Sequence, residues 1–178
     1  MPERTPPAPS LVIDFVNTLD IETGSDAIDS PVALRRWITQ RLGARFRSVD
    51  EEAWRRAIDT RESLRDLLAS HSGAELNPSA LKQLNRAGRG ASLQPQFNDE
   101  GEATLEPTDP GVNWALGRIL GAVVTAQSDG SWERLKVCQA EDCRFAFYDH
   151  SKNRSGRWCT MRVCGNRAKT KTYRQRHA

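Results

Sequence analysis

Residues 138–164 read CQAEDCRFAFYDHSKNRSGRWCTMRVC and include every cysteine of this 178-residue chain. The cysteines form two pairs with the same spacing, Cys138-x4-Cys143 and Cys159-x4-Cys164. Zinc takes four ligands at the corners of a tetrahedron, and such ligands usually come as two close pairs. The spacing therefore predicts one structural Zn²⁺ per chain, because four cysteines leave no open position for a catalytic water.

Two other arrangements of these cysteines have to be considered, namely two disulfides and four separate buried thiols. Disulfides belong to oxidising compartments, and the N-terminal stretch Met1–Ser10 lacks the apolar core of a signal peptide. Thiols that act as small apolar residues would be scattered through the larger part of the chain, which contains none. Both observations favour zinc. The missing signal-peptide core also leads us to expect a cytoplasmic protein. The most apolar stretch, 111–126, is too short to cross a membrane, which agrees with this expectation.

The charge of the chain divides at the same place as the cysteines. Residues 1–137 contain 16 Lys and Arg and 20 Asp and Glu, whereas residues 138–178 contain 10 and 3. The net charges are thus −4 and +7, and no acidic residue follows Asp149. An asymmetry of this kind indicates that the C-terminal part binds a polyanion.

Helix signals dominate the first 131 residues. Ser30-Pro31 and Asn77-Pro78 each place a capping side chain before a proline at the first helical position. Ser48 and Glu51 fit a capping box, in which each side chain bonds to the backbone N–H of the other. The helices predicted from these starts cover 31–42, 49–71 and 78–88, and each ends near a glycine: Gly43, Gly73 and Gly88.

Three more segments of the first 131 residues have a pattern that indicates secondary structure. Residues 91–106 are predicted to form two strands around the turn Asn98–Gly101. A helix over 110–127 is apolar on almost every side, and Gly117 and Gly121 would let another element approach it closely. Residues 11–19 are apolar too, but their periodicity fits a short strand and a helical turn equally well.

The C-terminal part is predicted to build its zinc site from strands and a helix. Residues 132–137 and 144–149 can form two strands joined by the first cysteine pair, and a last helix is expected from Asn166. Two ligands from a turn and two from a helix start give a treble-clef-like arrangement. The predicted fold class is therefore α+β and mostly α, with a helical domain over 1–131, including a small β-hairpin, and a zinc module over 132–178.

The last helix is polar on all sides, with Arg167, Lys171 and Arg174 on one face and Lys169 nearly opposite. A helix without an apolar face is not held by a core and needs a partner. A polyanion would relieve the repulsion between the like charges and release counterions. The candidate nucleic-acid contacts are Lys152, Arg154, Arg157, Asn166, Arg167, Lys169, Lys171 and Arg174.

Other functions fit parts of this sequence. The basic segment could be a solvated tail, or the module could act as an adaptor that docks an acidic protein. RNA binding is a third alternative, with Tyr148, Trp158 and Tyr173 as candidate stacking residues. Some treble-clef nucleases use histidines that His150 and His177 superficially match, but His177 is the penultimate residue and no further histidine is near it. We expect no enzyme, because no catalytic triad, phosphate-binding glycine loop or carboxylate pair is visible.

Four residues of the N-terminal part are candidates for contacts with a small effector. Asp14 and Asn17 are polar residues within an apolar run, and Arg61 falls on the otherwise apolar face of its helix. Trp37 would supply an aromatic contact, with Trp114 as an alternative. The alternative is structural, since buried polar groups need hydrogen-bond partners whether or not a ligand binds.

Several segments taken together carry the signature of a known group of proteins. They are Asp14-Phe15-Val16-Asn17-Thr18, Trp37, Cys138-x4-Cys143, Phe147-x-Asp149-x-Ser151, and Trp158-Cys159-x-Met161-x2-Cys164-Gly165-Asn166-Arg167-x-Lys169. This pattern resembles the CGNR zinc-finger family, bacterial proteins regarded as stress-induced transcription regulators. One departure is Gly156-Arg157, where that family more often has two basic residues, so one phosphate contact is expected to be missing.

The resemblance decides the choice of nucleic acid. It implies that the zinc module binds DNA, whereas the residues alone do not separate DNA from RNA. An arginine-rich helix is also suited to guanine edges in the major groove. The expected partners are therefore duplex DNA and a small-molecule effector, with a homodimer as a further candidate assembly.

Overall fold

A computed structural model describes residues 4–176 of the chain. Its α-helices are α1 (Pro7–Val16), α2 (Pro31–Leu42), α3 (Glu51–Ser70), α4 (Pro78–Ala91), α5 (Val112–Ser128) and α6 (Asn166–Arg176). The strands form three antiparallel pairs: β1 (Leu19–Asp20) with β2 (Ser25–Asp26), β3 (Leu93–Phe97) with β4 (Ala103–Pro107), and β5 (Leu135–Val137) with β6 (Ala146–Tyr148). The predicted mostly helical α+β class is confirmed. In the described part, no helix is long and apolar enough to span a membrane.

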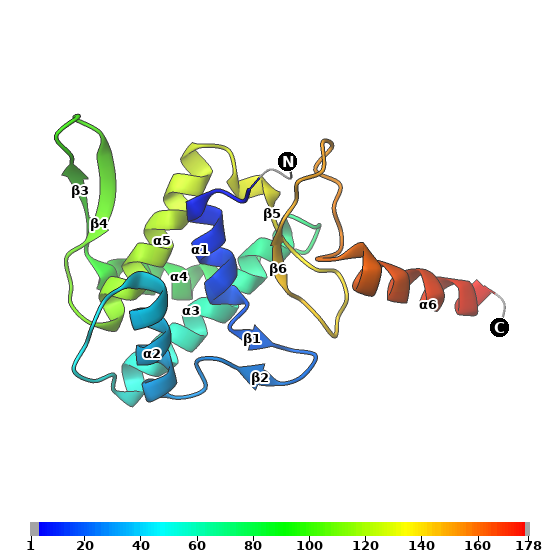
Figure 1. The fold of residues 1–178 in the computed structure, drawn as a ribbon, viewed down its shortest axis with the longest axis horizontal. Helices are drawn as coiled ribbons and strands as arrows, with labels where there is room; N and C mark the ends of the chain where they lie inside the picture. The colour runs from blue at the N-terminus through cyan, green and yellow to red at the C-terminus, as the bar shows by residue number, and fades with distance from the viewer. Residues whose placement is uncertain (1–3, 177–178) are drawn as a thin grey trace.

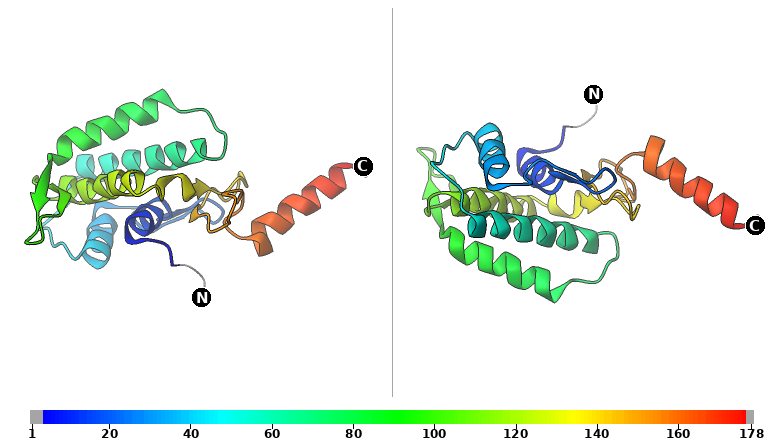
Figure 2. Two further views of the ribbon diagram at one scale, coloured as in Figure 1. Left: turned by 90° about the horizontal axis from the view of Figure 1, so that it is seen from above. Right: turned by 90° about the horizontal axis from the view of Figure 1, so that it is seen from below.

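Helix α5 is the centre of the helical body. It lies between α3 and α4 on one side and α1 and α2 on the other (Figure 2). A Cβ atom on Gly117 would lie 2.5 Å from the Cβ of Pro107, and one on Gly121 would lie 3.2 Å from the carbonyl oxygen of Leu105. The predicted close approach at these glycines is confirmed, and the approaching element is β4.

The ambiguous apolar segment near the N-terminus is helical. Val12, Phe15 and Val16 are fully buried, and their spacing places them on one face of α1. The helix ends at Asn17, after which Leu19–Asp20 pairs with Ser25–Asp26. Only the packing of this face against the core selects helix over strand.

Two predicted helix starts are confirmed and one is wrong. The side chain of Ser30 accepts a hydrogen bond from the backbone N–H of Ala33, and that of Asn77 accepts from Ala80. Helix α3 is capped by Asp50 instead of Ser48, because the Asp50 carboxylate accepts from the N–H of Ala53 at 2.7 Å. A negative side chain at this position also interacts favourably with the helix dipole.

The predicted end of the fourth helix at Gly88 is wrong, since α4 continues to Ala91. Glycine inside a helix costs about 1 kcal/mol relative to alanine. Burial offsets this cost, because the helix continues to Ala91, which is fully buried, and the Cβ position of Gly90 lies at an ordinary contact distance of 3.8 Å from the Asn113 side chain of α5. The helix ends one residue later at Ser92, which has a left-handed conformation with φ of 46°.

The β5–β6 hairpin is packed on the helical body. Leu135, Val137 and Ala146 are buried in the same apolar core as α1, α3 and α5. The Asn17 side chain donates to the carbonyl oxygen of Ala146 at 2.9 Å and accepts from its N–H at 2.7 Å. The division of the chain at residues 131 and 132 remains a prediction, but the two parts share this core.

A buried arginine joins the same two parts. The guanidinium of Arg65 donates to the carbonyl oxygens of Val16 at 2.6 Å and Arg144 at 2.8 Å. Its Nε donates to the Glu62 carboxylate at 3.0 Å. Burial lowers the pKa of Arg65, although the adjacent Glu62 opposes the change. Arg65 therefore ties α1 and the turn before β6 to α3.

The guanidinium group of Arg61 is hydrogen-bonded to three side chains of the helical body. Its Nη1 donates to the Asp26 carboxylate at 2.8 Å and to the Thr18 hydroxyl at 3.2 Å, and its Nε donates to Glu62 at 2.7 Å. Its side chain is 3% exposed. These bonds hold the β1–β2 turn against α3, and they explain why a charged residue interrupts an apolar helix face.

We predict that Arg61→Met lowers the free energy of unfolding by about 3–5 kcal/mol, because Asp26 would be left without its counter-charge. Urea unfolding followed by circular dichroism measures this change. The matched control is Arg55→Met on the same helix, whose exposed ion pair with Glu51 is worth about 0–1 kcal/mol. Equal stability of Arg61→Met and the unaltered protein would contradict the structural role.

Candidate metal centre and nucleic-acid interface

The first cysteine pair lies in the turn between β5 and β6. Cys138 N–H donates to the Phe145 carbonyl at 2.9 Å, and the N–H groups of Cys143 and Arg144 both donate to the Ala140 carbonyl. Arg144 closes the turn with a left-handed φ of 49°. This backbone pattern turns the sulfurs of Cys138 and Cys143 toward the same space.

The second pair precedes α6. Thr160 caps a π-helical turn, Met161–Gly165, which brings Cys164 back toward Cys159. A Cβ atom on Gly165 would lie 2.7 Å from the Met161 sulfur and 3.2 Å from the Trp158 ring. A larger residue at this position would therefore have to displace the end of the Met161 side chain and would press on the Trp158 ring.

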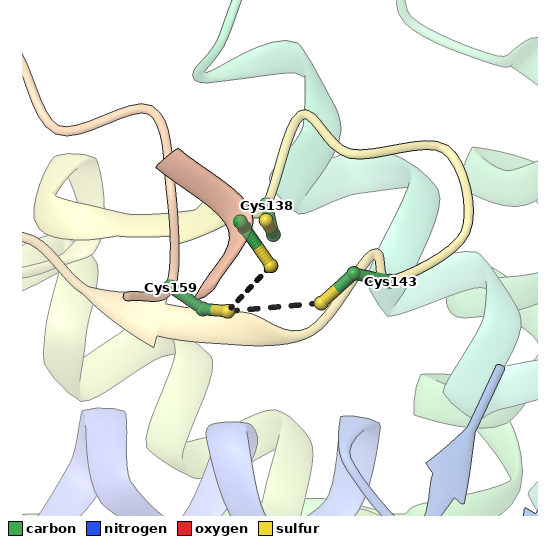
Figure 3. A group of neighbouring side chains, drawn as sticks. Cys138, Cys143 and Cys159 are labelled. Atoms are coloured by element: carbon green, nitrogen blue, oxygen red, sulfur yellow. Dashed lines mark hydrogen bonds between the residues drawn. The ribbon is translucent and has the colours of Figure 1, made fainter. Parts of the chain in front are cut away.

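The four sulfurs lie within 4.8 Å of one another. Figure 3 shows Cys138, Cys143 and Cys159 gathered at one place from separate segments of the chain. The Sγ–Sγ distance is 3.6 Å between Cys143 and Cys159 and 3.7 Å between Cys159 and Cys164. A tetrahedron with Zn–S bonds of about 2.3 Å has edges of about 3.8 Å, so the sulfurs fit one zinc ion.

All four cysteines are free, and none forms a disulfide. Burial raises the pKa of Cys143 to about 11, and burial together with the neighbouring thiols raises that of Cys159 as well. Zinc binds thiolates, so it would release protons from these two residues on binding. Phe145 and Trp158 pack against the cluster and limit access of water to it.

Arg167 is bonded directly to this centre. Its Nη2 donates to the Cys164 sulfur at 3.3 Å. Burial alone would raise the pKa of Cys164, but this bond and the bonds with the other cysteines lower it. Arg167 also forms ion pairs with Glu22 at 2.8 Å and Asp142 at 3.0 Å. The first turn of α6 is thus tied to the metal centre and to the β1–β2 turn.

The loop between β6 and Trp158 is organised by a buried ion pair that the sequence did not reveal. Lys136 donates to the Asp149 carboxylate at 2.8 Å, and the exposed fractions of their side chains are 7% and 3%. The Asp149 carboxylate also accepts from the N–H groups of Ser151 and Gly156. Burial alone would raise the pKa of Asp149, but these hydrogen bonds outweigh it and lower the pKa far below its usual value.

The predicted nucleic-acid contacts fall into two groups. Arg154 pairs with Glu133, Arg157 donates to Gln139 at 2.7 Å with its guanidinium over the Trp158 ring, and Asn166 donates to the Arg162 carbonyl. With Arg167, these residues already have protein partners. The side chains of the remaining four candidates have no hydrogen-bond or ion-pair partner in the described part of the chain. These are Lys152, Lys169, Lys171 and Arg174.

The four effector candidates do not meet in one cavity. Asp14 pairs with Arg41 at 2.6 Å, Asn17 bonds to Ala146, and Trp37 packs on Phe15 with ring centroids 5.5 Å apart. Arg61 is bonded to Asp26. Each side chain has a structural partner, so nothing in its surroundings calls for a ligand. Of the histidines considered for catalysis, His150 contacts the Tyr148 ring, and His177 lies outside the described residues.

We predict that protein purified without added metal contains one zinc per chain by elemental analysis. Cys143→Ser would lose the metal and loosen residues 157–176, because the other contacts that hold them are mainly partly exposed polar ones, such as the ion pairs of Arg167, which contribute little. The β5–β6 hairpin would keep its place, since Leu135 and Val137 are buried in the helical core. Hydrogen exchange read by mass spectrometry separates these two segments.

The matched control for this experiment is Val163→Ser, because Val163 is 50% exposed between two ligands. This variant should keep the zinc and its exchange protection. Zinc-free protein, or a hairpin that unfolds together with α6 in Cys143→Ser, would contradict the prediction.

We predict that Asp149→Asn lowers the free energy of unfolding at neutral pH by about 3–5 kcal/mol, because it leaves the Lys136 ammonium buried without a counter-charge. The lowered pKa of Asp149 means that its contribution is complete above the unfolded value of about 3.9 and is lost as the pH falls below it. Unfolding curves between pH 7 and pH 3 measure both effects.

The control is Glu133→Gln, which removes an exposed partner of Arg154 and should change stability by about 0–1 kcal/mol. The difference between Asp149→Asn and the unaltered protein should shrink as the pH falls. A difference that is constant over this range would show that the ionised carboxylate is not responsible.

Comparison with known families agrees with this geometry. Residues 10–130 match a family model described as "ABATE: Putative stress-induced transcription regulator", and residues 134–177 match the CGNR zinc finger. No curated protein matches the chain. The zinc-finger match and the four converging sulfurs together assign one structural zinc ion to the chain. The chain thus belongs to the ABATE family and carries a CGNR zinc finger after the ABATE region.

Proposed function

We propose that the protein is a cytoplasmic, DNA-binding transcription regulator that has no catalytic activity. Its zinc module binds duplex DNA, and its helical part responds to a small ligand. The observation that carries the DNA-binding proposal is the position of α6, which projects away from the body (Figure 1). A helix placed in this way can enter a groove without a clash between the body and the duplex.

The projecting part of α6 is exposed and basic. Residues 169–175 are all exposed, and Lys169, Lys171 and Arg174 are among them. With Val163 and Asn166, Arg174 lines one side of the helix, whereas Lys169 lies with Arg157 on another side. No apolar core holds this helix, which is the condition under which a partner is required.

Basic residues on opposite sides of α6 fit one duplex. The major groove is about 12 Å wide and an α-helix with its side chains is about 10–12 Å across, so each side of an inserted helix faces a phosphate backbone. Basic side chains on opposite sides of an inserted helix can therefore contact the same duplex. Arg174 is the best candidate for a base contact, since Arg167 is bonded to Glu22, Asp142 and Cys164.

The contact between Arg167 and Glu22 supports communication between the two parts. Glu22 belongs to the β1–β2 turn, which Arg61 holds on α3 through Asp26. A change in the helical body that moves this turn would change the orientation of α6.

Catalysis by the metal is disfavoured in this proposal, because four thiolates complete the tetrahedron.

We predict salt-dependent binding to duplex DNA, with log K falling against log salt at a slope of about −4 to −5 for four to six phosphate contacts. Lys171→Ala should weaken all sequences alike and flatten the slope by about one unit. Arg174→Ala, if it removes a guanine contact, should cost about 1–3 kcal/mol on a preferred site and relax sequence preference. Fluorescence anisotropy with a selected and a scrambled duplex measures these changes.

The control is Lys82→Ala, an exposed lysine on α4 that should leave the affinity and the slope unchanged. Absence of salt-dependent binding to any duplex would overturn the proposal. In that case, capture of an acidic protein or of single-stranded RNA by the same basic surface would take its place.

A further inference from the structure

The helical body has a cleft of about 580 Å³ between α1, α2, β4 and α5, at the end of the molecule far from α6 (Figure 1). Pockets for small organic ligands commonly have volumes of about 300–1,000 Å³. Of the residues considered as effector contacts, Trp114 lines this cleft, whereas Asp14, Asn17, Trp37 and Arg61 do not. It is therefore a separate feature that neither the metal centre nor the basic surface uses.

One wall of the cleft is apolar. Leu11 of α1, Leu42 of α2 and Leu105 of β4 contribute aliphatic side chains, and Trp114 of α5 contributes an aromatic ring. The Trp114 ring lies edge-on to Phe46, with ring centroids 6.5 Å apart. This neighbour restricts the orientation of the indole.

The polar lining of the cleft includes two arginines, each of which is paired with a carboxylate. Arg41 uses its Nε on Asp14, and Arg118 uses its Nη1 on Glu106. In the described part of the chain, the remaining guanidinium nitrogens of both residues have no protein partner. The Arg118 guanidinium also lies 5.9 Å from the centre of the Trp114 ring. Cationic donors thus stand directly beside the aromatic surface.

We propose that this cleft binds a small aromatic carboxylate, with its ring on Trp114 and the leucines and its carboxylate accepting hydrogen bonds from Arg41 and Arg118. Arginine is suited to this task because its planar fork of N–H groups matches the two oxygens of a carboxylate. The carboxylates of Asp14 and Glu106 balance the charges of the two arginines, so the preference for a carboxylate comes from the unpartnered guanidinium N–H groups and not from a net positive charge. Binding of this ligand does not depend on the proposed function. Only the role of the ligand as an effector of DNA binding rests on it.

The test is calorimetric titration of the full zinc-loaded protein with 1-naphthoate and with its neutral analogue 1-naphthalenemethanol. Loss of charge-assisted hydrogen bonds corresponds to about tenfold or more in affinity. Naphthoate should therefore bind at least about tenfold more tightly than the alcohol. Arg41→Gln and Arg118→Gln should each remove most of that preference, whereas Arg36→Gln, an exposed change on α2 outside the cleft, should not.

A second measurement does not depend on any variant. Naphthoate should slow amide hydrogen exchange in α1, β4 and α5 of the unaltered protein and leave α6 unchanged. The proposal is overturned by no binding, by equal binding of the alcohol, or by protection of α6 with loss of binding in Lys171→Gln. All these titrations are made without DNA, so their failure and a failure of DNA binding are seen separately.

Discussion

Four cysteine sulfurs that must meet at one metal ion determine the path of the chain from Cys138 to Cys164. The segment around them has few apolar residues, and a chain this short does not bury enough surface to fold without help. The metal replaces that missing core. It joins the turn after β5 to the turn before α6, and the direction of α6 follows from this junction. Arg167 then links the first turn of α6 to Cys164 and to the acidic residues Glu22 and Asp142.

The metal centre does not stand apart from the helical body. Leu135, Val137 and Ala146 are buried in the core that α1, α3 and α5 form. Hydrogen bonds between the helical body and the β5–β6 hairpin fix the position of the hairpin. Asn17 bonds to both backbone groups of Ala146, and Arg65 donates to the carbonyl oxygen of Arg144. Apolar contacts alone would tolerate a sliding hairpin, whereas buried donors and acceptors have to meet their partners. A change in the body can therefore reach the base of α6 through rigid contacts.

The role of each basic residue depends on whether an acidic side chain lies close to it. Basic residues close to the body meet acidic ones and become structural, as Arg154 does with Glu133 and Arg144 with Asp66. Among the described residues, the basic side chains of α6 beyond its first turn form no ion pair, and they stay available for a polyanion. The buried pair of Lys136 and Asp149 shapes the loop that carries Lys152. The same residue types thus serve two purposes, and position relative to the body decides which one.

Local chemistry was sufficient for much of this molecule. The cysteine spacing determined the metal ligands, and the helix starts at Ser30 and Asn77 and the β3–β4 hairpin followed from capping and turn residues. The family resemblance was likewise legible in the sequence. Such features depend on residues within a few positions of one another, whose preferences act before any tertiary contact forms.

Tertiary structure decided the features that depend on partners far along the chain. It made residues 7–16 a helix and carried α4 past Gly88, because burial outweighs the weak local signals there. Asn17, Arg61 and Arg167 were read as ligand or nucleic-acid contacts, yet their neighbours in space are Ala146, Asp26 and Glu22, separated from them by tens of residues or more. A sequence shows that a polar side chain requires a partner, but only the folded chain brings that partner within hydrogen-bond distance.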